Sequence, residues 1–134
     1  PPSHPPVVPR FLQQALRGGS LVIFGDGEQT RDFVYVDDVV DALMAAATAS
    51  DVDRRTINIG SGQETSVNEL AALVAKAVGR EVEILHSPAE SGGVSHLRAD
   101  ISLARRLLDY DPQVDLKQGL RYTLERDPRF MDRI

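Results

Sequence analysis

Apolar residues recur at helical spacing in five stretches of this chain. The first stretch predicts a helix that starts near Pro9, a favourable first-turn residue, and stops at Gly18. A second predicted helix starts at a capping box made by Ser66 and Glu69 and stops at Gly79. Three more helices are predicted behind acidic residues that can accept N–H bonds at a helix start, namely Asp37 or Asp38, Asp100 and Asp115.

Between these helices lie short β-prone or alternating runs, at residues 21–24, 31–36, 56–60 and 82–86. Strands that alternate with helices predict an α/β fold. Four short strands make only an incomplete sheet, and several apolar helix faces lack a partner layer in this chain. At 134 residues, the length predicts one domain over residues 1–134.

A glycine turn stands directly before the second predicted strand. Gly25 and Gly27 supply the backbone freedom of a sharp reversal, and Arg31 follows at the start of the strand. A guanidinium in this position is suited to bidentate phosphate binding. The alternative is an ion pair with a neighbouring carboxylate, from Asp32, Asp37 or Asp38.

Composition excludes several classes of function. The net charge of −5 and the scattered Lys and Arg residues argue against nucleic-acid binding. The absence of cysteine excludes disulfides and thiolate chemistry, and no apolar run is long enough for a membrane span. We therefore expect a cytoplasmic protein. The start is rich in proline and has no Met, which predicts a piece of a longer or processed protein, with a proline-rich linker as the alternative.

The stretch LVIFGDGEQTRDFVYVDD, from Leu21 to Asp38, resembles the extended short-chain dehydrogenase/reductase family. The likeness is to its NAD-dependent nucleotide-sugar epimerases and dehydratases, and above all to the UDP-glucose 4-epimerases. It runs from about Val7 to Arg129 and matches only the C-terminal part of such enzymes. The resemblance implies that a Rossmann half is missing and that residues 56–60 form a stray strand of its sheet.

The resemblance further implies a function. This chain would be the nucleotide-sugar-binding part of an NAD-dependent UDP-sugar 4-epimerase, with a UDP-sugar as partner. A nucleotide-sugar 4,6-dehydratase or a UDP-glucuronate decarboxylase or epimerase portion is the alternative within the family. Outside it, the alternatives are a non-catalytic nucleotide-diphosphate-binding module and an inert fragment that self-associates through its apolar helix faces.

The chain lacks the residues for the family's hydride chemistry. No glycine-rich dinucleotide fingerprint opens a strand–helix unit, because the Gly60-Ser61-Gly62 loop has neither the third glycine nor the downstream acid. The family's Tyr and Lys stand four residues apart on one helix, and no tyrosine here has a lysine at that offset. We therefore expect no catalytic residue and no NAD site in this chain, with NAD bound by the parent enzyme.

What remains is substrate binding. By resemblance, Arg31 binds the nucleotide diphosphate, and Val22 and Phe24 meet the uracil mainly through their main chain. Phe33 matches an aromatic position near the nucleotide. For Val22, Phe24 and Phe33, packing in the core is the alternative interpretation.

One loop departs from the family pattern. Glu90 stands where the family has a diphosphate-binding arginine, and Gly93 stands where it has a ribose-binding acid. Because a carboxylate repels a diphosphate, we expect either that this loop swings away or that another residue supplies the cation. Arg98 is the expected cation, with His96 as the alternative. The chain has three histidines, His4, His86 and His96, and they are too dispersed to form a metal site. The sequence therefore predicts no metal site.

Overall fold

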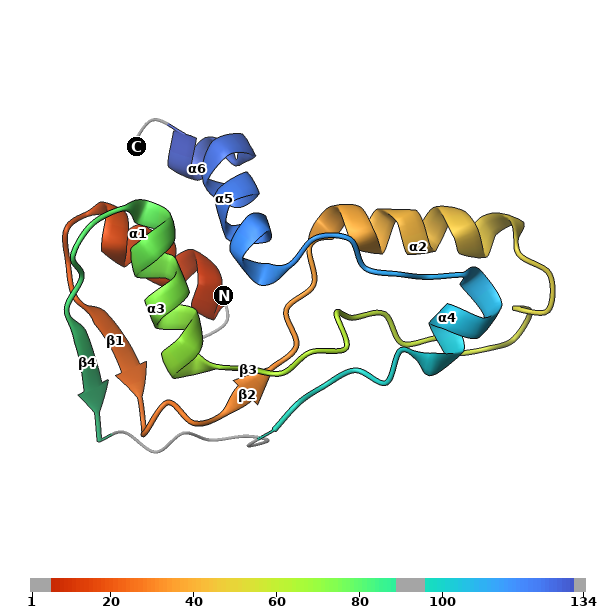
Figure 1. Ribbon diagram of the computed structural model, residues 1–134, viewed down its shortest axis with the longest axis horizontal. Coiled ribbons are helices and arrows are strands. Elements are labelled where there is room, and N and C mark those ends of the chain that lie inside the picture. Colours follow the sequence, from red (N-terminus) through yellow and green to blue (C-terminus); the bar gives the residue numbers. More distant parts are fainter. Residues whose placement is uncertain (1–5, 89–95, 132–134) are drawn as a thin grey trace. The chain divides into compact units, whose positions relative to one another are not determined.

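The structure is a computed structural model that describes residues 6–88 and 96–131. Two compact units make up the fold. Unit 1 contains residues up to Gln29, those from Ser66 to Ser95 and those from Leu120 onward, and unit 2 contains Thr30–Thr65 and His96–Gly119. Helices and short strands alternate along the chain, so the predicted α/β class is confirmed (Figure 1).

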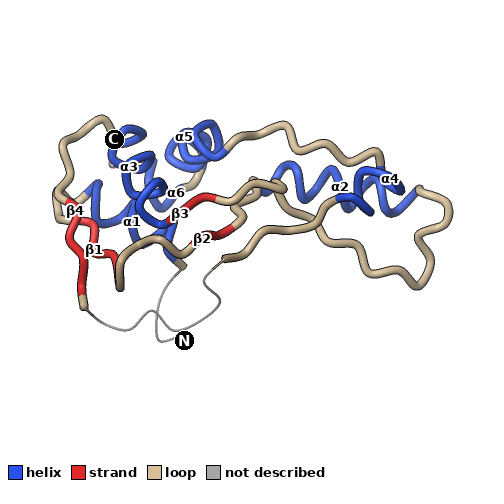
Figure 2. The backbone as a smooth tube through the Cα atoms, turned by 60° about the horizontal axis from the view of Figure 1, so that its bottom comes forward, coloured by secondary structure: helices blue, strands red, loops and turns tan. Residues whose placement is uncertain are grey.

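Unit 1 packs helices against a parallel strand pair. Helix α1 (Val7–Leu16) contacts α3 (Val67–Val78), α6 (Pro128–Met131) and strand β1 (Leu21–Phe24). Strand β1 lies beside β4 (Ile84–Ser87) (Figure 2). The two strands pair in parallel, with Leu21 opposite Ile84. The fully buried side chains of this unit form its core: Phe11, Leu12, Leu21, Ile23, Leu70, Val74, Leu120 and Phe130.

The helix boundaries in unit 1 follow the sequence signals. Helix α1 buries the four residues predicted for its inner face, Phe11, Leu12, Ala15 and Leu16. The capping box of α3 is present, since Glu69 N–H donates to the Ser66 hydroxyl and Ser66 N–H donates to the Glu69 carboxylate. Gly79 ends the helix in the left-handed conformation at φ 70°. These ends are local motifs, which is why the sequence predicts them.

Unit 2 contains α2 (Val36–Thr48), α4 (Ser102–Leu108) and the start of α5 (Leu116–Arg126). Its strand β2 (Thr30–Arg31) pairs with β3 (Thr65–Ser66). Helices α2 and α4 contact each other. The buried core residues of unit 2 are Ala42, Ile101, Ala104, Leu108 and Tyr110.

Two predictions for the start of α2 need correction. The strand predicted at 31–36 is shorter, since β2 ends at Arg31, residues 32–35 form no strand and α2 begins at Val36. Neither Asp37 nor Asp38 caps α2, since the N-cap is Tyr35 and both aspartates lie in the first turn. In the first turn, their negative charges interact favourably with the positive end of the helix dipole. Asp38 is also buried and accepts N–H bonds from Gln113 at 2.8 Å and Val114 at 3.1 Å.

The segment 56–60 is predicted to be a strand, and the structure assigns it none. Ile57 and Ile59 instead pack against the core of unit 2. A strand is defined by hydrogen bonds to a neighbouring strand, and within the described residues this segment has no such neighbour. Its assignment to a Rossmann sheet remains a prediction.

Helix α2 exposes large apolar residues. Leu43 and Met44 are 65% and 67% exposed, while the small Ala42 is buried. The sequence pattern correctly finds an apolar stripe, but this stripe is not the face that α2 buries in the structure. The expected self-association through such faces stays a prediction.

Candidate functional site

The glycine turn of unit 1 is held by Asn68, at the start of α3. The Asn68 amide donates to the carbonyl of Asp26 at 3.0 Å and to the carboxylate of Glu28 at 2.8 Å. The Asn68 side-chain oxygen pairs with His86 Nε2 at 2.9 Å. Gly27 has φ 76°, and a Cβ there would collide with the Asn68 side chain. The left-handed conformation favours glycine at this position, and a larger residue would also displace the Asn68 side chain from its hydrogen bonds.

Strand β1 carries the two residues predicted to meet the base, Val22 and Phe24. The N–H groups of Leu21 and Gly25 donate to carbonyls on the β4 side, at 2.8 and 2.9 Å. Because alternate residues point their main-chain groups to opposite edges of a strand, those of Val22 and Phe24 face the edge away from β4. Both side chains are half-buried. The structure thus places the two residues on one edge of one strand.

Arg10 of α1 lies at this edge. Its guanidinium stacks on the rings of Phe24, at 4.8 Å, and Phe11, at 5.2 Å. Its Nη2 donates a long hydrogen bond to the Val22 carbonyl, at 3.4 Å. Partial burial lowers the pKa of Arg10 from its ordinary value. No local pattern in the sequence singles out Arg10, because its contacts lie on a strand remote in the chain.

Arg31 and Phe33 belong to unit 2. Arg31 lies on β2 and its Nη1 donates to the carbonyl of Thr30 at 2.7 Å. Phe33 is half-buried in the segment between β2 and α2. On the same strand, the Thr30 hydroxyl lies 3.3 Å from His96 Nδ1.

Asp32, between Arg31 and Phe33, binds two distant segments of unit 2. Its Oδ1 accepts bonds from the N–H and the hydroxyl of Ser61, at 2.7 and 2.6 Å. Its Oδ2 accepts bonds from the N–H groups of Gly62, at 2.9 Å, and Ala99, at 3.1 Å. We call these four residues, Asp32, Ser61, Gly62 and Ala99, the Asp32 clamp. The sequence offers Asp32 only as a candidate ion-pair partner, whereas in the structure it links the residue after β2 to two remote segments.

Gly60 packs so closely against the Asp32 clamp that no side chain would fit at this position. A Cβ at this position would lie 2.5 Å from the Ala99 Cβ and 2.9 Å from Asp32 Oδ2. The buried Tyr110 hydroxyl donates to the Gly60 carbonyl at 2.8 Å. The loop that resembles part of a dinucleotide fingerprint is therefore a packed structural loop.

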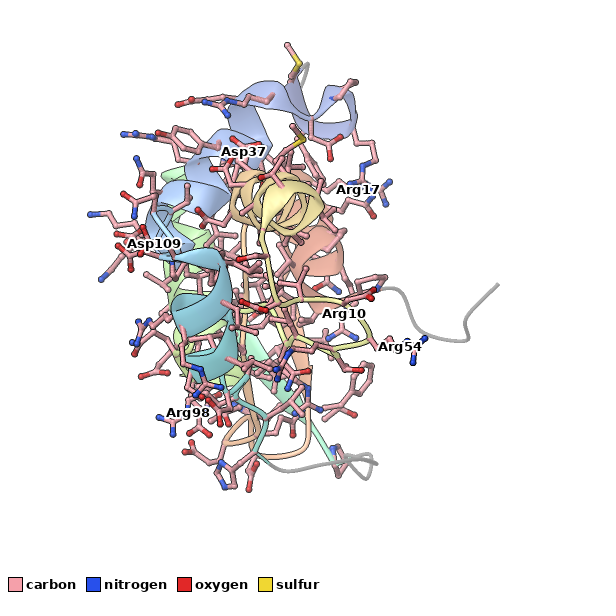
Figure 3. All side chains as sticks on the ribbon, turned by 90° about the vertical axis from the view of Figure 1, so that its right-hand side faces the viewer. Arg10, Arg17, Asp37, Arg54, Arg98 and Asp109 are labelled. Atoms are coloured by element: carbon pink, nitrogen blue, oxygen red, sulfur yellow. The ribbon has the colours of Figure 1, made fainter. Side chains whose placement is uncertain are left out.

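Arg98 lines an open groove of about 720 Å³ in unit 2. Two more arginines, Arg105 and Arg106 of α4, line the same groove, together with Asp100. Arg31 and Phe33 are not among the lining residues. The Arg98 side chain is exposed (Figure 3). Glu90 and Gly93, the two departures from the family pattern, lie outside the described residues, as does His4.

Tyr110 predicts a dependence of stability on alkaline pH. Burial raises the pKa of its phenol, and the charges of three aspartates add to this rise, namely Asp38, Asp32 and Asp111. A raised folded-state pKa stabilises the fold below the ordinary tyrosine pKa of about 10, and this contribution is lost as pH rises through the folded-state value. We therefore expect the free energy of unfolding to fall above about pH 10.

The variant Tyr110→Phe tests this expectation in urea unfolding series between neutral and alkaline pH. It should lower stability at neutral pH by about 1–2 kcal/mol, because the Gly60 carbonyl loses its donor. It should also reduce the alkaline fall. An unchanged alkaline slope in the variant would show that other groups cause the fall.

Comparisons with known proteins give this geometry a context. Residues 2–60 match the NAD dependent epimerase/dehydratase family. Over 119 residues the chain is 42% identical to the UDP-glucose 4-epimerase of Mycolicibacterium smegmatis, a match that covers 89% of this chain and 38% of that protein. Over 125 residues it is 34% identical to the UDP-N-acetyl-alpha-D-glucosaminuronate decarboxylase of Bacillus cytotoxicus, covering 89% of this chain and 39% of that protein.

A solved structure agrees with these matches. The crystal structure of the UDP-glucose 4-epimerase of Thermotoga maritima with UDP-glucose is similar at a TM-score of 0.85 and 38% identity, covering 94% of this chain and 40% of that one. The chain thus has the fold of part of an extended short-chain dehydrogenase/reductase. Its sequence and fold match part of a protein of the NAD-dependent epimerase/dehydratase family, as its sequence predicts. It spans about two fifths of the length of these relatives.

The Gly60–Gly62 loop does not fit the pyrophosphate of NAD, the cofactor in the family's name. A dinucleotide pyrophosphate needs free N–H groups on a glycine loop. In the Gly60–Gly62 loop, the N–H groups of Ser61 and Gly62 already donate to Asp32, a carboxylate that would repel phosphate. Within residues 6–88 and 96–131 the structure also shows no cluster of three potential metal ligands. No helix there is long and apolar enough to cross a membrane.

Proposed function

We propose that this chain is the nucleotide-sugar-binding part of an NAD-dependent UDP-sugar 4-epimerase. The observation that supports this most is the likeness over 94% of the chain to an epimerase solved with UDP-glucose. In this proposal Val22 and Phe24 meet the uracil, Arg31 binds the diphosphate, and Phe33 and Arg98 assist near the nucleotide. NAD and the reacting groups belong to the rest of the parent enzyme.

The physical contribution of this part is positioning. Arg31 presents a planar fork of donors that matches two phosphate oxygens, and the Asp32 clamp holds the adjacent backbone. Binding energy at the nucleotide, away from the reacting sugar, fixes where the sugar lies. The chain's own residues therefore bind and orient the substrate, and no proton or hydride step is assigned to them.

Titration of UDP and of inorganic pyrophosphate into the chain tests the proposal. Arg31→Ala should weaken both by about tenfold or more, the loss of one or two charge-assisted hydrogen bonds. Arg31→Lys keeps the positive charge but loses the planar fork of donors. Its affinities should therefore fall between those of the unaltered chain and those of Arg31→Ala. Arg54→Ala removes an exposed arginine of the same unit and should leave both affinities unchanged.

Each outcome of this titration decides something. If the unaltered chain binds no UDP at millimolar concentration, it is not a nucleotide-binding part by itself, and the inert-fragment alternative is favoured. If UDP binds and Arg31→Ala binds it equally well, the role of Arg31 is wrong. In that case the ion-pair alternative for Arg31 is supported.

The decarboxylase at 34% identity favours a second candidate, a decarboxylase or dehydratase portion of the same family. Such enzymes differ from epimerases at the sugar. Comparison of UDP-glucose with UDP-glucuronate addresses the choice, because the latter carries a carboxylate. A clear preference for UDP-glucuronate would favour a portion of a UDP-glucuronate enzyme, either a decarboxylase or a UDP-glucuronate 4-epimerase. A preference for UDP-glucose would count against the decarboxylase alternative.

A further inference from the structure

Arg10 has more donor capacity than the described residues use. A guanidinium carries five N–H donors, and within the described residues Arg10 makes one long hydrogen bond, to the Val22 carbonyl at 3.4 Å. Its Nε is buried without a hydrogen-bond partner. None of the ion pairs of the described residues includes Arg10. A partly desolvated cation with unfilled donors is an unfavourable arrangement unless an acceptor reaches it.

The position of Arg10 shows where such an acceptor would lie. The guanidinium stacks on Phe24, at 4.8 Å from the ring centroid, so its plane is restrained at the outer edge of β1. The Val22 carbonyl points to the same edge. In uracil, the ring N–H is flanked by two carbonyl oxygens. A base whose N–H donates to Val22 would therefore bring a ring carbonyl next to the Arg10 donors.

We propose that Arg10 is a base-recognition residue, whose guanidinium donates to a ring carbonyl oxygen of the uracil of a bound UDP-sugar. This inference rests on the proposed function, because it takes the edge of Val22 and Phe24 as the place of the base. It adds a charged, side-chain contact to a strand edge that would otherwise read the base through main-chain groups alone. The three residues involved, Arg10, Val22 and Phe24, all lie in unit 1.

A purely structural role would be to cover the Phe24 ring. Arg10→Met separates the two roles, because methionine keeps an unbranched apolar side chain over the ring and removes every donor. The matched control is Arg17→Met, which removes an exposed guanidinium just beyond the end of the same helix (Figure 3). Thermal melting and the dispersion of the amide NMR spectrum report whether each variant folds.

The ligands are uridine, inorganic pyrophosphate and UDP, each titrated by NMR. We expect Arg10→Met to weaken the binding of uridine and of UDP by about tenfold and to leave the binding of pyrophosphate unchanged. Arg31→Ala should show the converse pattern, weakening pyrophosphate and UDP but not uridine. Arg17→Met should change none of the three. In the unaltered chain, uridine but not pyrophosphate should shift the Nε–H resonance of Arg10, a measurement that does not depend on any variant folding.

Three results would overturn the inference. In the first, Arg10→Met binds uridine as tightly as the unaltered chain while Arg31→Ala still weakens pyrophosphate binding. This result would refute the base-recognition role of Arg10 and leave the proposed function unaffected. An Arg10 Nε–H resonance that uridine does not move would refute it in the same way. No UDP binding by the unaltered chain would remove the proposed function, and this inference with it.

Discussion

Asp32→Ala is expected to destabilise unit 2 by about 3–4 kcal/mol, more than most single substitutions cost a protein. The Asp32 carboxylate accepts four hydrogen bonds, from the N–H and hydroxyl of Ser61 and from the N–H groups of Gly62 and Ala99. Removing the acceptor leaves three backbone donors without a partner in a partly buried place. The loss is less than the sum of four bonds, because water replaces some of them.

Urea unfolding and amide hydrogen exchange together measure this effect. Exchange at Ser61, Gly62 and Ala99 should accelerate in Asp32→Ala beyond what global unfolding accounts for. Asp32→Asn should cost about half as much, since its oxygen still accepts from Ser61 while its NH₂ group faces other donors. Asp53→Ala, an exposed aspartate of the same unit, should change stability by no more than about 0.5 kcal/mol.

A neutral result for Asp32→Ala would mean that the clamp does not hold the strand of Arg31. The titration with inorganic pyrophosphate provides a second test of the clamp. If the clamp positions Arg31, Asp32→Asn should also weaken pyrophosphate binding while the chain remains folded. Unchanged pyrophosphate affinity in a folded Asp32→Asn variant would show that Arg31 does not depend on the clamp.

Gly60→Ala is expected to cost about 3 kcal/mol, because the new methyl group overlaps atoms that cannot easily move. Its Cβ would lie 2.5 Å from the Ala99 Cβ and 2.9 Å from Asp32 Oδ2. The Ala99 Cβ is fixed by its own backbone, and that backbone is bound to Asp32. The strain therefore falls on the clamp rather than on a flexible side-chain end.

A double-mutant cycle with Ala99→Gly tests this cause. Removing the Ala99 methyl group clears one of the two overlaps, so Gly60→Ala should cost at least about 1 kcal/mol less in the Ala99→Gly background. Equal costs in both backgrounds would show that contact with Ala99 is not the source of the destabilisation. Gly19→Ala serves as a control for glycine replacement, since the nearest atom to a Cβ there is at an ordinary 3.5 Å.

Much of the fold follows from local sequence signals. The capping box of Ser66 and Glu69, the stops at Gly18 and Gly79 and the inner face of α1 involve residues within a few positions of each other. Local hydrogen bonds and helical periodicity determine them, so they can be read without knowledge of the rest of the chain. The same holds for the glycine turn before Arg31.

Predictions fail where remote contacts compete with local ones. Of the β-prone run at 31–36, only Arg31 lies in a strand and only Val36 lies in α2. The alternating run at 56–60 packs on a core without a strand partner. The stripe of Leu43 and Met44 is apolar, yet α2 buries Ala42 instead. Propensity is a weak prior, and the available partner surfaces decide between its alternatives.

By itself, the sequence determined the α/β class, most helix ends and the family, because these depend on local patterns and on the ordered stretch from Leu21 to Asp38. Only the tertiary structure decided what Asp32 and Arg10 do. Asp32 bonds to residues about 30 and 67 positions away, and Arg10 stacks on Phe24 of a separate element. Contacts between remote segments depend on how those segments pack, and no local spacing in the chain specifies them.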